Sequence, residues 1–338
     1  MTQALFMTTL ISGTLISISS NSWFSAWMGL EINLLSFIPL MTTSKNTLAT
    51  EATLKYFLIQ ALASIIFLFS TTLMQFLSFN SSTMSNNFFV MLISSTLLLK
   101  MGAAPFHFWF PGTMEGLNWV NCFLLMTWQK IAPLILLSYL MKMNLFTSTI
   151  IIMSVIIGSL GGLNQTSLRK LLAYSSINHI GWMIAAMVCG ENLWELYFII
   201  YTFLTLSLIF MFSTHQIFHL NQSFLTWNSM NSFKLLLYLT LLSLGGLPPF
   251  LGFLPKWMVI QSLVSINSSF TSFIMVIMTL ITLFYYIRLT FSAFLLNYSQ
   301  MKWINFHTSF NYNFLISIIT TSISSLGLLM CSLIYNFL

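Results

Sequence analysis

The chain has 338 residues, of which 57% are hydrophobic and only 5% are charged, and its mean hydropathy is +0.90. A water-soluble domain usually carries about 25% charged residues, so this composition excludes a soluble enzyme or binding module and indicates an integral membrane protein. The net charge is +6, but the sequence has no basic run, which excludes a nucleic-acid-binding surface.

Apolar runs separated by polar residues or by glycine and proline predict eleven membrane-spanning helices, because about 20 apolar residues cross a bilayer. In chain order the predicted spans are 3–20, 23–42, 53–79, 88–110, 117–140, 147–163, 169–189, 193–218, 235–265, 272–296 and 313–336. The first lacks the basic region of a cleavable signal, so we expect it to be kept as a span. The fourth and ninth contain clusters of glycine and proline, which predict two broken helices.

The charges between the spans predict the orientation in the membrane. If the N-terminus lies inside, the inner loops carry Lys45, Lys55, Arg169, Lys170, Lys234 and Lys302, whereas the outer loops carry only Lys142, with Glu191 and Glu195 nearby. Lysine and arginine accumulate on the inner side of membrane proteins. We therefore expect the N-terminus inside and the C-terminus outside.

The two predicted broken helices resemble each other in sequence. The first reads LLLKMGAAPFHFWFPG (97–112) and the second LSLGGLPPFLGFLPK (242–256). A single offset of 144 residues pairs Gly102 with Gly246, Pro105 with Pro249, Phe106 with Phe250, and Pro111 with Pro255. The breaks are an odd number of spans apart, so the two units have opposite orientations. Inverted repeats with discontinuous helices are typical of secondary transporters, although glycine and proline can also merely kink a helix.

Four charged residues lie deep inside the predicted spans, away from the span ends. Glu31 is near the middle of the second span, Lys130 is central in the fifth, Lys100 precedes the first break, and Lys256 follows the second. A charge at the centre of a membrane helix costs on the order of 2.5–3.5 kcal/mol by insertion scales. Snorkelling to the interface explains the basic residues near span ends, which are Arg288, Lys55 and Lys170. It explains Lys130 poorly, so we expect the four buried charges to be functional.

Buried lysines and carboxylates suit proton transfer. Desolvation favours the neutral form of a lysine, whereas a nearby carboxylate favours the charged form. Moving or removing the partner charge would therefore switch a lysine between holding and releasing its proton. A row of such groups joined by water would form a relay across the middle of the membrane.

The histidines and cysteines give weaker signals. His179, central in the seventh span, suits a proton relay or an interhelical hydrogen bond equally well. His107, after the first break, suits either a proton exit or packing against its aromatic neighbours. His215 and His219 have helical spacing but no third ligand nearby, so we expect no metal site. The cysteines lie far apart in apolar stretches and are expected to be inert core residues; they are Cys122, Cys189 and Cys331.

Motifs for nucleotides and redox cofactors are absent from the sequence. It has no GxGxxG with an acidic partner, no P-loop, no CxxC, and no paired-histidine pattern for haem. We therefore expect no nicotinamide, flavin, iron–sulfur cluster or nucleotide in this chain.

Several long stretches resemble a known family. They are SNSWFSAWMGLEINLLSFIPL (20–40), LLLKMGAAPFHFWFP (97–111), MTWQKIAPL (126–134), IGSLGGLNQTSLRKLLAYSSINHIGWM (157–183) and LSLGGLPPFLGFLPKW (242–257). Through them, essentially the whole chain resembles the mitochondrially encoded chain 2 subunits of respiratory complex I, NADH:ubiquinone oxidoreductase, of insect type.

The resemblance implies an antiporter-like membrane-arm subunit with two inverted five-helix units, 1–142 and 143–298, followed by a loop and a last helix in 299–338. It implies that Glu31 and Lys100 form a carboxylate–lysine pair, that Lys130 is the central connecting lysine, and that Lys256 is the lysine of the second unit. The bacterial relatives have three further N-terminal helices, which this sequence lacks.

The resemblance also implies the setting of the chain. FMN, iron–sulfur clusters and ubiquinone are expected in other subunits. The partners are expected to be neighbouring antiporter-like chains, accessory subunits and lipids of the mitochondrial inner membrane, with the N-terminus in the matrix and the C-terminus in the intermembrane space. Two alternatives to proton translocation remain, a scaffold subunit that transmits signals without passing a proton, and a free-standing cation/proton antiporter.

Overall fold

The computed structural model describes residues 2–42, 46–77, 83–222, 231–295, 316 and 318–327. Seven of the described helices are long and apolar enough to cross a membrane, by length and composition, and four shorter apolar helices accompany them. Each predicted span overlaps one of these helices, although part of the last span, 313–336, lies outside the described residues. The predicted all-α membrane fold is therefore confirmed.

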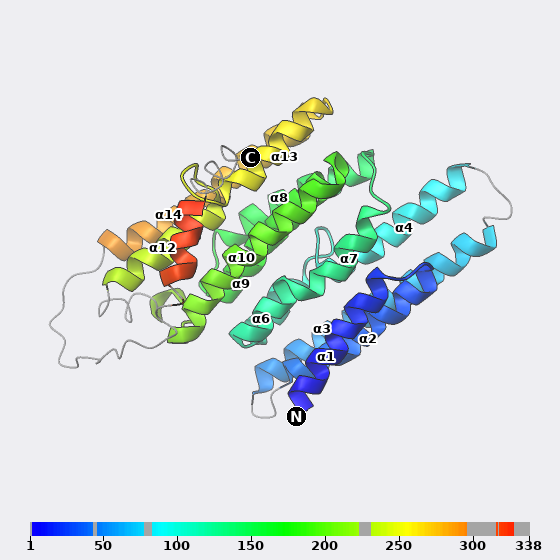
Figure 1. The fold of residues 1–338 in the computed structure, drawn as a ribbon, viewed down its shortest axis with the longest axis horizontal. Helices are drawn as coiled ribbons and strands as arrows, with labels where there is room; N and C mark the ends of the chain where they lie inside the picture. The colour runs from blue at the N-terminus through cyan, green and yellow to red at the C-terminus, as the bar shows by residue number, and fades with distance from the viewer. Residues whose placement is uncertain are drawn as a thin grey trace. The chain divides into compact units, whose positions relative to one another are not determined.

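The first of two compact units covers Met1–Ser154. Its helices are α1 (Thr2–Ile18), α2 (Trp23–Met41), α3 (Thr47–Leu77), α4 (Thr83–Met101), α5 (Trp109–Gly116), α6 (Trp119–Met126) and α7 (Trp128–Ser138). Helices α1, α2 and α3 run side by side, and α3 packs on α4 and α5 (Figure 1). The α1–α2 crossing is close, because a Cβ on Gly29 would lie 2.5 Å from the backbone nitrogen of Ser17.

The second compact unit covers Val155–Leu338. Its helices are the C-terminal part of α8 (Leu145–Gly162), then α9 (Leu168–Cys189), α10 (Glu191–His215), α12 (Asn231–Gly245), α13 (Phe253–Ser265), α14 (Ser269–Leu295) and a last described helix at 318–327. Helix α9 packs against α10 and α13, and α12 packs against α10 and α14. Every residue of α9 from Ser175 to Met187 is buried, so α9 is a central helix of this unit.

Several predicted boundaries differ from the structure. Helix α3 begins at Thr47 and not at 53. At this start, Asn46 Oδ1 accepts a hydrogen bond from the Leu48 backbone nitrogen at 3.1 Å, and the helix includes the exposed Glu51–Lys55 pair. The first broken helix resumes after its break and runs to Gly116, six residues past the predicted end at 110. The predicted span 117–140 is interrupted at Thr127, whose hydroxyl donates to the Phe123 carbonyl at 2.7 Å.

Candidate functional site

Both predicted breaks are present, and each begins at a glycine. Helix α4 ends at Met101, followed by Gly102 with φ +74°; α12 ends at Gly245, followed by Gly246 with φ +84°. Positive φ values are unfavourable for residues with a Cβ, so glycine is the usual residue there. Gly102 and Gly246, which are paired by the sequence repeat, thus both follow the last residue of a helix and both have positive φ.

The backbone hydrogen bonds of the two breaks repeat at the offset of 144 residues. In the first, the donor–acceptor pairs are Gly102 to Leu99, Ala103 to Leu98, Phe106 to Ala103, and Phe110 to His107. In the second, they are Gly246 to Ser243, Leu247 to Leu242, Phe250 to Leu247, and Leu254 to Leu251. Each of these four bonds in one unit has its equivalent in the other, so the correspondence extends from residue identity to part of the backbone hydrogen bonding.

Side chains satisfy the carbonyls that the breaks expose. The last carbonyls of a helix have no partner within the helix, and an unsatisfied carbonyl at membrane depth costs several kcal/mol. In the first unit, Gln60 Nε2 donates to the Lys100 carbonyl and Trp109 Nε1 to the Leu99 carbonyl, both at 3.1 Å. In the second unit, Lys256 Nζ donates to the Gly245 carbonyl at 2.7 Å. One of the two broken ends is therefore capped by a buried lysine.

All three predicted lysines are buried. Lys100 is 7% exposed, Lys130 1% and Lys256 6%, which excludes snorkelling as the explanation of Lys130. The Lys130 Nζ lies 5.0 Å from the centroid of the Phe110 ring, a cation–π contact. Lys130 also lies three residues after the interruption at Thr127, and its backbone nitrogen donates to the Thr127 carbonyl at 3.1 Å. Each lysine therefore lies in the first or last turn of an apolar helix, next to an interruption.

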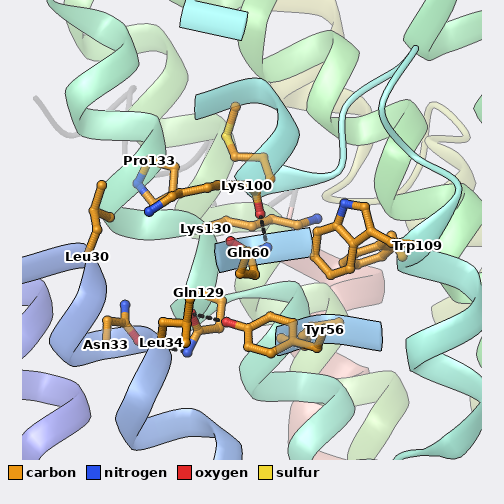
Figure 2. A pocket seen from close by; sticks show the side chains of 13 residues that line it. Leu30, Asn33, Leu34, Tyr56, Gln60, Lys100, Trp109, Gln129, Lys130 and Pro133 are labelled. Carbon is orange, nitrogen blue, oxygen red and sulfur yellow. Dashed lines mark hydrogen bonds between the residues drawn. The ribbon is translucent and has the colours of Figure 1, made fainter. Parts of the chain in front are cut away.

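A cavity of about 20 Å³ in the first unit has both Lys100 and Lys130 in its wall. This volume accommodates about one water molecule. Figure 2 shows the Gln129 side chain between Asn33 and Tyr56: its Nε2 donates to Asn33 Oδ1 at 2.8 Å, and its Oε1 accepts from the Tyr56 hydroxyl at 3.3 Å. Amides and a hydroxyl thus line the space between the two lysines.

The predicted carboxylate, Glu31, lies on α2 and is half-buried. Its charge acts on both Lys100 and Tyr56. The two side chains of the predicted pair do not form a contact ion pair of 4.0 Å or less; among the described residues such a contact joins Lys55 and Glu51. Glu31 and Lys100 are therefore not a contact pair, and their functional partnership stays a prediction.

The two candidate relay histidines have different surroundings. His179 is 5% exposed, and its Nδ1 lies 2.8 Å from the Tyr197 hydroxyl. His107 is 6% exposed and stacks against Phe108, with 4.3 Å between ring centroids. Both predicted alternatives for each residue remain open, because hydrogen bonding and packing are compatible with proton transfer.

The remaining predicted residues lie apart from these lysines or outside the described part of the chain. Arg288 donates to the Leu163 carbonyl, just beyond the end of α8. Cys122 is buried, and its Sγ donates to the Met114 carbonyl at 3.6 Å. Within the described ranges no three His, Cys, Asp or Glu side chains are placed to share a metal ion. The described residues do not include Lys45, Lys302 and Cys331, nor the side chains of Glu191, His215 and Lys234.

Comparison with known proteins decides the family. The family described as NADH:quinone oxidoreductase/Mrp antiporter, TM, matches residues 20–282. The NADH-ubiquinone oxidoreductase chain 2 of Anopheles gambiae is 56% identical over 333 residues, 98% of this chain and 97% of that protein. The chain 2 of Aedes aegypti is 58% identical over 336 residues, 99% of this chain and 98% of that protein. This chain belongs to the NADH-ubiquinone oxidoreductase chain 2 family.

The fold of this chain also matches that of a solved structure. A chain of respiratory complex I from Thermus thermophilus, with bound aureothin, superimposes with a TM-score of 0.84 at 24% identity. The match covers 97% of this chain and 77% of that one. The antiporter-like fold expected from the sequence is therefore confirmed.

Four polar residues near the lysines of the first unit were not predicted from the sequence. Asn33, Tyr56, Gln60 and Gln129 all line the cavity. Gln129 precedes Lys130 directly, and Asn33 follows Glu31 by two positions, but single amides and tyrosines are too common in membrane helices to stand out. A search for polar residues within one helical turn of each buried charge would have found Gln129 and Asn33.

Proposed function

We propose that this chain is a proton-translocating subunit in the membrane arm of respiratory complex I. The observation that carries the proposal is the burial of Lys100, Lys130 and Lys256 at interrupted helices inside apolar spans. Membership of the chain 2 family supports it. Ionisable groups held at membrane depth typically mark ion pathways and proton relays.

The proposed relay uses each residue in a distinct way. In the first unit, Glu31 sets the field around Lys100, and Lys100 exchanges protons with Lys130 through the amide-lined cavity. In the second unit, Lys256 holds or releases a proton at the end of α12. His179 and His107 are further candidates for proton transfer. The assignment of 1–142 and 143–298 as inverted repeats, with 299–338 following, belongs to the same proposal.

The driving reaction would take place in other subunits. NADH oxidation and ubiquinone reduction would use FMN and iron–sulfur clusters there, while this chain carries protons only. Its partners would be neighbouring antiporter-like chains, accessory subunits and lipids. It would lie in the mitochondrial inner membrane with its N-terminus on the matrix side and its C-terminus on the intermembrane-space side.

The test replaces Lys130 by methionine in the assembled complex, reconstituted into sealed vesicles. NADH oxidation and proton movement are measured together. We expect fewer protons moved for each NADH oxidised, or a loss of both rates. An unchanged ratio with normal assembly and turnover would identify a scaffold subunit and overturn the proposal.

A further inference from the structure

The glycine of each helix break is covered by a different kind of side chain. In the second unit, a Cβ on Gly246 would lie 3.0 Å from both Cδ and Nζ of Lys256, so the lysine packs directly on the break. In the first unit, a Cβ on Gly102 would lie 3.1 Å from Cβ of Phe110 and 3.3 Å from two of its ring atoms. A phenyl ring therefore covers the first break where a lysine covers the second.

Phe110 is held in this position by the start of α5. It is 1% exposed, its backbone nitrogen donates to the His107 carbonyl at 3.0 Å, and its carbonyl accepts from the Thr113 hydroxyl at 3.0 Å. The neighbouring Trp109 donates from Nε1 to the Leu99 carbonyl at 3.1 Å, which ties α5 to the last turn of α4. The backbone that carries the Phe110 ring is therefore fixed against the end of α4.

The Phe110 ring also contacts a buried cation. The Nζ of Lys130 lies 5.0 Å from the ring centroid, and both residues line the cavity whose wall includes Lys100. The negative face of an aromatic ring attracts an ammonium group far more strongly than a neutral amine, and this attraction is largest where water is excluded. Since Lys130 is only 1% exposed, the ring offers its protonated ammonium group a binding surface next to the break.

We infer that Phe110 is a positioning residue of the proposed relay, which holds the protonated Lys130 at the first break; the inference rests on the proposed proton translocation. Lys256 reaches its own break directly, whereas Lys130 comes from α7 and reaches the first break through the ring. Without the ring, the long Lys130 side chain loses the contact that fixes its ammonium group beside the cavity shared with Lys100. Proton exchange across the cavity would then slow, because the reacting groups are less well positioned.

The test changes the electronic character of the ring while keeping its shape. Trifluorophenylalanine in place of Phe110 weakens the negative face of the ring, and Phe110→Leu removes the ring altogether. In sealed vesicles that contain the assembled complex, Phe110→Leu is expected to lower the rate of proton translocation roughly fivefold to thirtyfold, which corresponds to a cation–π contact of about 1–2 kcal/mol. The fluorinated ring is expected to give an intermediate loss.

The controls separate an electrostatic role of the ring from ordinary packing. Trifluorophenylalanine in place of Phe69, a phenylalanine of α3 that is 59% exposed, is expected to match the parent. Assembly is checked by native gel electrophoresis. If Phe110 only fills space, the fluorinated complex translocates protons normally, and this result would overturn the inference whether or not Phe110→Leu assembles.

Lys130→Met is measured alongside to test the proposed function separately. Loss of pumping in Lys130→Met, together with normal pumping by the fluorinated Phe110 complex, refutes only the role of Phe110. Normal pumping by Lys130→Met refutes the proposed function itself.

Discussion

Lys256 donates a hydrogen bond from Nζ to the carbonyl of Gly245, the last residue of α12, at 2.7 Å. The C-terminal end of a helix carries partial negative charge and free carbonyls. The break in this membrane helix therefore creates a favourable site for an ammonium group in surroundings that otherwise oppose it. Lys256 and the break stabilise each other.

Gly246→Ala is expected to disrupt this arrangement. The residue has φ +84°, which costs a residue with a Cβ roughly 1–2 kcal/mol, and the new Cβ would lie 3.0 Å from both Cδ and Nζ of Lys256. We expect lower thermal stability of the complex and impaired proton translocation. Gly112→Ala is the matched control, because Gly112 lies within α5 and a Cβ there meets nothing within 4 Å. Equal effects of the two substitutions would contradict this account of the break.

Gln129→Met is expected to disorganise the cavity of the first unit. The change keeps the length of the side chain but leaves Asn33 Oδ1 and the Tyr56 hydroxyl without their bonds to Gln129. A buried polar group left unsatisfied costs about 1–3 kcal/mol. Combining it with Asn33→Leu should cost less than the sum of the two changes, with a coupling of about 0.5–3 kcal/mol in thermal or denaturant unfolding. Strict additivity would mean that the pair does not act as a unit.

Glu31→Gln tests the predicted partnership with Lys100. The substitution removes the charge that acts on Lys100 while keeping the shape of the side chain. We expect coupled turnover to fall by about tenfold or more, as for loss of a positioned proton-transfer group. Glu51→Gln is the control, because Glu51 is exposed and pairs with Lys55 at the start of α3. Parent-like proton translocation in Glu31→Gln would remove Glu31 from the relay.

The sequence was sufficient to predict the spans, the two breaks and the burial of the lysines. The length of each apolar run predicts a membrane crossing, and the clusters of glycine and proline predict helix ends. Gly102 and Gly246 lie at two such ends. The interruption at Thr127 was not predicted, because threonine is common in continuous membrane helices. The partners of the charges were not predictable either, since Gln60 and Lys100 meet only through the packing of α3 against α4.

The number of protons moved for each NADH oxidised tests the central claim most directly. It should be measured in sealed vesicles for the parent complex, for Lys256→Met, and for Lys142→Met, whose lysine is exposed on the loop after α7. We predict that Lys142→Met equals the parent, and that Lys256→Met moves fewer protons per NADH or stops coupled turnover. A Lys256→Met complex with full turnover and an unchanged proton ratio would contradict the account.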